Sequence, residues 1–145
     1  MRFRKVAVGG TFDGLHRGHR ALLEKAFEIG DWVLIGLTKD SFSGKKTRSF
    51  DERKKALETY LGGRRYEVVE LRDPYGPAVS DPSLEAIVVS EETEPRAREI
   101  NEIRAERGLE ALEIVVVPLV LAENGRPISS TRIRRGEIDE EGRLL

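Results

Sequence analysis

The chain has 145 residues and a formal net charge of −1, from 25 basic and 26 acidic side chains. This length suits one domain with a sizeable core, and the balanced charge gives no general attraction to nucleic acid or to a membrane surface. The lack of cysteine excludes disulfides, cysteine nucleophiles and thiolate metal sites. No apolar run approaches the roughly 20 residues that span a bilayer, and the start of the chain has no signal-peptide core. We therefore expect a single cytoplasmic domain over residues 1–145 that binds neither nucleic acid nor membranes, with a glutamine-free, highly charged composition typical of a thermophile.

The first half of the chain alternates strand-like and helix-like segments. A short apolar strand at residues 6–8 precedes a glycine-rich loop and a helix from about residue 17, which Gly30 is suited to end. Residues 31–38 are almost continuously apolar, which is typical of a buried parallel strand. After a loop rich in lysine, serine and glycine at residues 39–48, the capping box Ser49-x-x-Glu52 predicts a second helix that ends at residue 61.

The second half continues this alternation. Three further strands are expected, at residues 66–71, 84–90 and 112–117. A polar loop occupies residues 73–82, and a helix spans residues 91–108, with Pro95 tolerated near its first turn. The run that begins at Ile128 opens a last helix.

This order of elements predicts an α/β fold, namely one Rossmann-like domain with an open, mostly parallel sheet and helices on both faces. Ligands in such folds bind beyond the carboxyl ends of the strands. The segments expected to converge there are residues 9–19, 39–48, 73–82 and 90–96 and the turn at Ser129.

The segment after the first strand, Gly9-Gly10-Thr11-Phe12-Asp13-Gly14-Leu15-His16-Arg17-Gly18-His19, has the features of an anion site. Glycines permit close backbone approach, and the helix that follows points free N–H groups at the loop. The first helical turn carries Arg17, His19 and Arg20, although a helix N-terminus favours acidic side chains. We therefore expect a bound phosphate. Two other uses of the histidines stay open, namely helix capping and metal ligation, for which the chain offers no cysteine and no third histidine.

Two common phosphate-binding motifs are absent. A Walker loop fails at Lys39 and Lys46, which stand where a glycine and a hydroxyl residue are required. The dinucleotide fingerprint fails at Thr11, where it needs a glycine. The remaining pattern is T-x-D-x-x-H-x-G-H.

A second group of cations follows a helix start near the C-terminus. Ser129, Ser130 and Thr131 are suited to cap a helix, yet arginines stand at positions 132, 134 and 135. Two such sites in one chain favour a polyphosphate. The alternative is a capped surface helix whose arginines pair with the acidic residues at positions 137 and 139–141.

The pattern around His16 and His19 resembles the HxGH signature of the nucleotidylyltransferases, and residues 128–134 resemble their second signature, ISSTxIR. The chain as a whole resembles the archaeal and eukaryotic type of phosphopantetheine adenylyltransferase. The matches are Gly9 to Asp13, Tyr75-Gly76-Pro77, Val89 to Thr93, Ile100-Asn101, Arg104 and Gly136 to Asp139. This resemblance implies transfer of AMP from ATP to 4′-phosphopantetheine, which gives dephospho-coenzyme A and pyrophosphate. Another HxGH adenylyl- or cytidylyltransferase with a different phosphorylated acceptor, and a nucleotide-binding module without turnover, are the alternatives.

The resemblance also implies which residues bind ATP. They are Gly10, Thr11, Phe12, His16, Gly18, His19, Ser90, Ser129, Ser130, Thr131 and Arg134. His19 and Thr11 would act at the reacting phosphates with a loop lysine, for which Lys45, Lys46 and Lys39 are candidates and Lys45 is our choice. The acceptor phosphate is largely dianionic at neutral pH, so neither a side-chain nucleophile nor a general base is needed.

For the acceptor, the expected residues are Thr11, Asp13, Lys46, Asp73 and Tyr75, although the last two are equally suited to brace their own loop. Arg96 and Arg104 are candidates to face the phosphates. Mg²⁺ is expected to bind through phosphate oxygens rather than through protein ligands. A monomer is the expected form.

Overall fold

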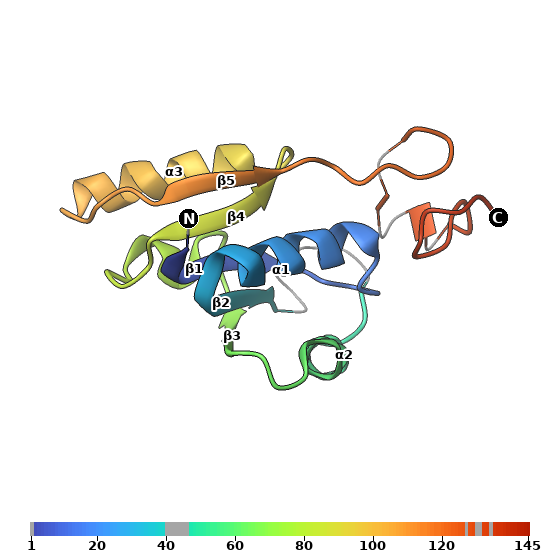
Figure 1. Ribbon diagram of the computed structural model, residues 1–145, viewed down its shortest axis with the longest axis horizontal. Coiled ribbons are helices and arrows are strands. Elements are labelled where there is room, and N and C mark those ends of the chain that lie inside the picture. Colours follow the sequence, from blue (N-terminus) through green and yellow to red (C-terminus); the bar gives the residue numbers. More distant parts are fainter. Residues whose placement is uncertain (1, 40–46, 127, 130–131, 134) are drawn as a thin grey trace.

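The computed structural model describes residues 2–39, 47–126, 128, 129, 132, 133 and 135–145. Its elements, in chain order, are β1 (Phe3–Gly10), α1 (Arg17–Ile29), β2 (Gly30–Thr38), α2 (Phe50–Leu61), β3 (Tyr66–Leu71), the 3₁₀ helix η1 (Gly76–Val79), β4 (Ala86–Ser90), α3 (Glu94–Glu106) and β5 (Glu113–Val117). Figure 1 shows a sheet with helices on both sides and a C-terminal segment, residues 118–145, beyond one end of the strands. Among the described residues, no helix is long and apolar enough to cross a membrane.

All strands of the sheet pair in parallel, in the order β3-β2-β1-β4-β5. β1 is central, where Val8 pairs with Ile35 of β2 and with Val88 of β4. The chain runs outwards from β1 through β2 and β3, and then crosses to the other side of β1 for β4 and β5. Such a reversal opens a crevice at the carboxyl ends of the two central strands. The predicted α/β fold is confirmed.

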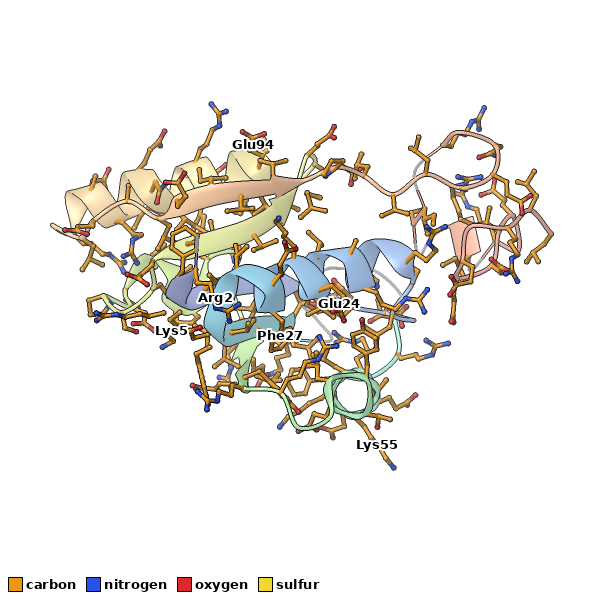
Figure 2. All side chains as sticks on the ribbon, in the orientation of Figure 1. Arg2, Lys5, Glu24, Phe27, Lys55 and Glu94 are labelled. Atoms are coloured by element: carbon orange, nitrogen blue, oxygen red, sulfur yellow. The ribbon has the colours of Figure 1, made fainter. Side chains whose placement is uncertain are left out.

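The strands contribute side chains to two separate apolar layers, one on each face of the sheet, because successive side chains of a strand point to opposite faces. The first layer joins Val6, Val8, Val33, Ile35, Leu37 and Val88 to Leu23 and Ala26 of α1 and to Leu57 and Leu61 of α2. The second joins Ala7, Leu34, Ile87 and Val89 to Ala97 and Ile100 of α3 and to Ala78 and Val79 of η1. Helices therefore cover both faces, as predicted, while charged side chains such as that of Lys55 on α2 point outwards (Figure 2).

Local sequence signals locate several elements correctly. The Ser49 Oγ accepts a hydrogen bond from the Glu52 N–H at 3.2 Å, which is half of the predicted capping box. The third strand covers the predicted residues 66–71, and residues 33–38 of β2 are buried throughout. The expected loop at residues 73–82 differs, because it contains η1. The Asp73 carboxylate accepts the N–H groups of Tyr75 and Gly76 at 2.8 and 2.7 Å and so folds the chain into this turn.

Of the predicted last helix, the structure describes Arg132 and Ile133, and both are helical. The Ser129 Oγ accepts the Arg132 N–H at 3.2 Å, and the Ser129 carbonyl accepts the Ile133 N–H at 3.1 Å. The chain leaves the helical conformation at Gly136, which has a φ of 75°. The N–H groups of Gly136 and Glu137 donate to the carbonyls of Ile133 and Arg132, both at 3.0 Å. This pair of bonds is the usual way to end a helix at a glycine.

The C-terminal segment is attached to the first turn of α1 by a set of contacts that we call the C-terminal latch. The Arg17 N–H donates to the Glu140 carbonyl at 3.0 Å, and the Arg17 guanidinium donates to the Glu141 carbonyl at 3.3 Å. The Glu141 carboxylate also forms an ion pair with Arg20. The latch therefore satisfies one of the N–H groups that the start of a helix leaves free.

Candidate active site

The loop after β1 and the start of α1 line a hollow of about 270 Å³ at the carboxyl ends of β1 and β4, together with the apolar residues 117–120 and Ile128. It is the more polar of two adjoining hollows, and we call it the polar hollow. All described residues that the sequence predicts to bind ATP line it, namely Gly10, Thr11, Phe12, His16, Gly18, His19, Ser90 and Ser129. Asp13 lines it as well. Residues far apart in the sequence therefore meet at one site. The predicted residues Lys45, Lys46, Ser130, Thr131 and Arg134 lie outside the described part of the chain.

His16 is the N-cap of α1. Its Nδ1 accepts hydrogen bonds from the N–H groups of Gly18 and His19 at 3.0 and 3.3 Å. A side chain at position 18 would bring a Cβ within 2.8 Å of the His16 ring, so the glycine between the two histidines is required by sterics. Because Nδ1 is an acceptor, the proton of the neutral ring is on Nε2. The capping role left open by the sequence is thus real, and it still leaves one N–H donor on His16.

His19 lies between two aromatic rings. It stacks on His16 with 3.6 Å between ring centroids and meets the Phe12 ring edge-on at 5.4 Å. Its buried Nδ1 has no hydrogen-bond partner among the described residues. A buried polar atom without a partner costs about 1–3 kcal/mol. The ring is therefore held by packing against His16 and Phe12 rather than by a hydrogen bond at Nδ1.

Burial keeps both histidines neutral. It lowers the pKa of His16 from 6.5 to about 4. Burial, together with the neighbouring charge that His16 would carry, lowers the pKa of His19 from 6.5 to about 3. At neutral pH the site therefore offers imidazole N–H donors rather than imidazolium cations.

Thr11 is supported from two sides. Its Oγ1 accepts a hydrogen bond from the Thr38 Oγ1 at the end of β2, at 3.1 Å. Its carbonyl accepts one from the Arg53 guanidinium of α2 at 2.9 Å. No sequence signal indicates that Arg53 belongs near the site, because a single arginine in a helix full of charged residues is usually exposed.

The cations of the first turn of α1 have a partner within the chain. In the sequence, Arg17 and Arg20 indicate a bound anion. In the structure both contact Glu141 through the C-terminal latch. Arg132 likewise lies 3.8 Å from the Glu137 carboxylate, as the surface-helix alternative proposed. The groups available to bind an anion at this site are therefore the N–H donors of the neutral histidines and of the helix start rather than these arginines.

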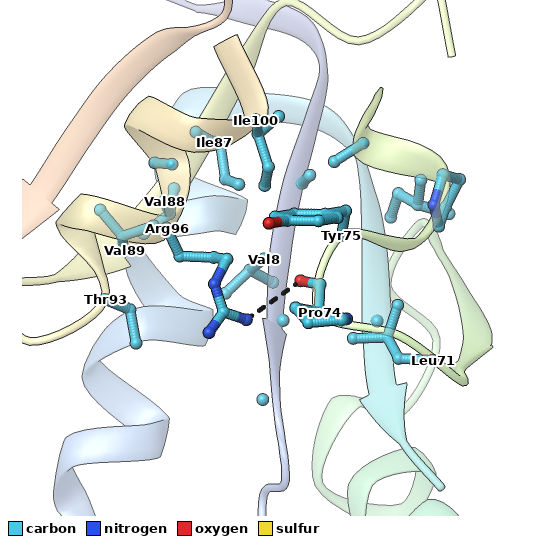
Figure 3. Close-up of a pocket in the computed structure, with 18 of the residues that line it drawn as sticks. Val8, Leu71, Pro74, Tyr75, Ile87, Val88, Val89, Thr93, Arg96 and Ile100 are labelled. Atoms are coloured by element: carbon cyan, nitrogen blue, oxygen red, sulfur yellow. Dashed lines mark hydrogen bonds between the residues drawn. The ribbon is translucent and has the colours of Figure 1, made fainter. Parts of the chain in front are cut away.

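A second, apolar hollow of about 170 Å³ adjoins the first (Figure 3). Its wall combines the second apolar layer with the loop that follows β3, including Leu34, Leu71, Pro74, Tyr75 and Ile100. Arg96 lies at this wall, where its guanidinium donates to the Pro74 carbonyl at 3.5 Å and lies 5.8 Å from the Tyr75 ring. The two hollows share Gly9, Gly10, Val88, Val89 and Thr93. Two ligands of different polarity can therefore meet over β1 and β4.

Three other sequence candidates have clear structural positions. Asp73 braces its loop through the two backbone bonds described above, and these bonds lower the pKa of its carboxyl group. Arg104 is buried and donates to the carbonyls of Ala78, Asp81 and Glu110, so it braces the protein rather than facing a phosphate. Lys39 lies 3.9 Å from the Glu70 carboxylate. Among the described residues, no three His, Cys, Asp or Glu side chains gather in a group able to hold a metal ion.

The fold agrees with what comparison with known proteins shows. Residues 7–136 match the cytidylyltransferase-like family model, and the chain belongs to this class of nucleotidyltransferases. It is 52% identical over 149 residues to the phosphopantetheine adenylyltransferase of Methanothermobacter thermautotrophicus, across 99% of this chain and 91% of that one. It is 53% identical over 147 residues to the enzyme of the same name from Methanopyrus kandleri, across 96% and 93% of the two chains. Within the class, the chain belongs to the phosphopantetheine adenylyltransferase family.

A solved structure is also similar. The crystal structure of a protein with unknown function from Archaeoglobus fulgidus superposes with a TM-score of 0.73 at 35% identity, across 78% of this chain and 88% of that one. The shared fold extends over most of both chains.

Proposed function

We propose that the protein transfers AMP from ATP to 4′-phosphopantetheine and releases dephospho-coenzyme A and pyrophosphate. The observation that carries this proposal is the meeting of a polar and an apolar hollow over Gly9 and Gly10. The polar hollow has the donors that a triphosphate needs, and the apolar hollow suits the pantetheine arm. The junction is where the acceptor phosphate and the α-phosphate would meet.

The chemistry needs positioning and charge stabilisation rather than a protein nucleophile. The acceptor phosphate supplies the attacking oxygen, and pyrophosphate leaves with the electron pair of the broken bond. His19 and His16 would donate N–H groups to phosphate oxygens on which negative charge grows during the transfer. Donors that are already fixed when the charge develops pay no cost of reorganisation. The Thr11 hydroxyl, which accepts from Thr38, keeps its own hydrogen for the acceptor phosphate.

Other parts of the expected machinery complete this proposal. Ser129 and the residues after it would hold the β- and γ-phosphates, and Lys45 would assist the transfer. Mg²⁺ would arrive with ATP, bound by phosphate oxygens and water as is usual for this ion. We propose a cytoplasmic enzyme that acts as a monomer.

The test is release of pyrophosphate by the purified protein, with the nucleotide product identified by mass spectrometry. ATP and CTP are each combined with 4′-phosphopantetheine and with pantetheine that lacks the phosphate. We expect rapid turnover only with ATP and the phosphorylated acceptor, because the nucleophile is the phosphate of the acceptor. A preference for CTP, or equal turnover with unphosphorylated pantetheine, would refute the proposal.

A further inference from the structure

Arg53 is the least expected polar side chain near the site. It has 1% of its surface exposed and is one of the largest fully buried side chains of the described residues. Burying a guanidinium is costly unless its N–H groups are hydrogen-bonded. Three of them donate to backbone carbonyls, of Arg48 at 2.8 Å, Thr11 at 2.9 Å and Thr38 at 2.8 Å.

These acceptors come from three different parts of the site. Thr11 follows β1 and lines the polar hollow, Thr38 ends β2 and lines the apolar hollow, and Arg48 precedes α2. Thr38 and Arg48 also flank the lysine-rich segment of the sequence. One rigid, planar group therefore sets the distances between the ends of two strands and the start of a helix.

The hydrogen bonds of Arg53 also determine how the hydroxyl groups of Thr11 and Thr38 lie. Because Arg53 binds the carbonyls of both Thr11 and Thr38, it fixes the separation of the two backbones. At this separation the Thr38 Oγ1 reaches the Thr11 Oγ1 and donates to it at 3.1 Å. Thr11 is then left with its own O–H as a donor, on an oxygen that is held in place.

We propose that Arg53 is a positioning residue for the transfer reaction, which acts through Thr38 to aim the Thr11 hydroxyl at the acceptor phosphate. This inference rests on the proposed function and extends it to a residue that touches no substrate. A displacement of about 1 Å at a reacting group can cost on the order of 10²-fold in rate. The rate preserved by fixing Thr11 would therefore offset the cost of burying a guanidinium.

The chain offers a matched control in Arg104. It also has 1% of its surface exposed and also donates to three backbone carbonyls, of Glu110, Ala78 and Asp81, at 2.7, 2.8 and 3.0 Å. It lies in the last turn of α3, and none of these three hydrogen bonds involves Thr11 or Thr38. A lysine at either position keeps the charge but loses the planar fork.

The experiment compares Arg53→Lys with Arg104→Lys for melting temperature, ATP affinity by calorimetry, and kcat and KM for 4′-phosphopantetheine. We expect similar losses of melting temperature in both. Only Arg53→Lys should lose at least ~10-fold in kcat, with ATP affinity within about threefold of wild type. Equal kcat losses in the two variants would overturn the proposal, since a general loss of stability would then explain both.

Thr38→Val serves as a second variant, because it removes the hydroxyl donor to Thr11 while leaving Arg53 in place. It should reduce kcat with little change in melting temperature or ATP affinity, and it decides the question if Arg53→Lys does not fold. A Thr38→Val protein with wild-type kcat would overturn the proposal. If the wild-type protein itself makes no dephospho-coenzyme A, the proposed function fails instead, and the two failures are thereby separated.

Discussion

Replacing His19 with alanine should abolish most of the catalytic rate while leaving the fold intact. The ring contributes two aromatic contacts, with His16 at 3.6 Å and with Phe12 at 5.4 Å between centroids. Each such contact is worth about 0.5–1.5 kcal/mol of stability. Against this loss, the variant no longer buries an Nδ1 atom without a partner among the described residues, which returns about 1–3 kcal/mol. The lost burial of the ring adds to the first effect, so we expect a modest net loss of unfolding free energy in a protein that still folds.

The rate behaves differently because nothing offsets the loss. A fixed donor to the developing charge of a transition state is worth about 10²–10³-fold in kcat, or roughly 3–4 kcal/mol. We therefore expect His19→Ala to lose at least ~10²-fold in turnover. ATP should still bind, because the other residues of the polar hollow remain.

The assay measures pyrophosphate release, ATP affinity by calorimetry and thermal unfolding on the same preparations. Tyr60→Phe is a control for modest destabilisation away from the site, since it removes the 2.6 Å bond from Tyr60 to Glu24 between α2 and α1. It should retain wild-type turnover. A His19→Ala protein that turns over at the wild-type rate, or that cannot fold, would show that the ring is only part of the packing.

Three further predictions follow from the same region. His16→Asn should unfold with a free energy within about 1 kcal/mol of wild type, because asparagine also caps helices, but its KM for ATP should rise since the Nε2 donor is lost. Both histidines have a pKa in the folded protein, about 4 and about 3, that lies below the value of about 6.5 in an unfolded chain. The unfolded chain therefore takes up protons first, so the unfolding free energy in urea titrations should fall as the pH drops from about 6.5 towards 4, and less steeply when both histidines are replaced. Glu141→Gln should cost at most about 1 kcal/mol, since its pairs with Arg17 and Arg20 are partly exposed, yet it should speed proteolytic cleavage within residues 118–145 by weakening the C-terminal latch.

Local signals in the sequence were sufficient for most of the fold. The Ser49 capping box, the buried run of β2 and the glycine after α1 each depend on neighbours within a few residues. The helix expected after Ser129 depends on the same kind of signal, since the Ser129 hydroxyl accepts the Arg132 N–H and the described residues Arg132 and Ile133 are helical.

The site was partly predictable for a related reason. The histidine motif identified its own loop, and His16, Gly18 and His19 of the first signature line one hollow with Ile128 and Ser129 of the second. The ion pairs of Arg17 and Arg20 were missed because their partner, Glu141, lies more than a hundred residues away in the sequence. For the same reason the sequence offers no prediction for Arg53 and suggests a phosphate for Arg104, since each is buried where distant carbonyls converge on it.

The two hollows are lined by different parts of the fold and share only a narrow boundary. Selectivity for the nucleotide and selectivity for the acceptor would therefore depend on different residues. The histidines of the polar hollow lie at the start of α1, which packs in the first apolar layer. The wall of the apolar hollow belongs to the second apolar layer, which contains α3 and η1. Only the backbone-rich strip at Gly9 and Gly10, with neighbouring residues of β4 and Thr93, belongs to both. If the acceptor occupies the apolar hollow as proposed, we expect substitutions on α3 or in the loop before η1 to change the acceptor preference and to leave the binding of the nucleotide unchanged. A fold divided in this way would allow one nucleotide site to be combined with different acceptors.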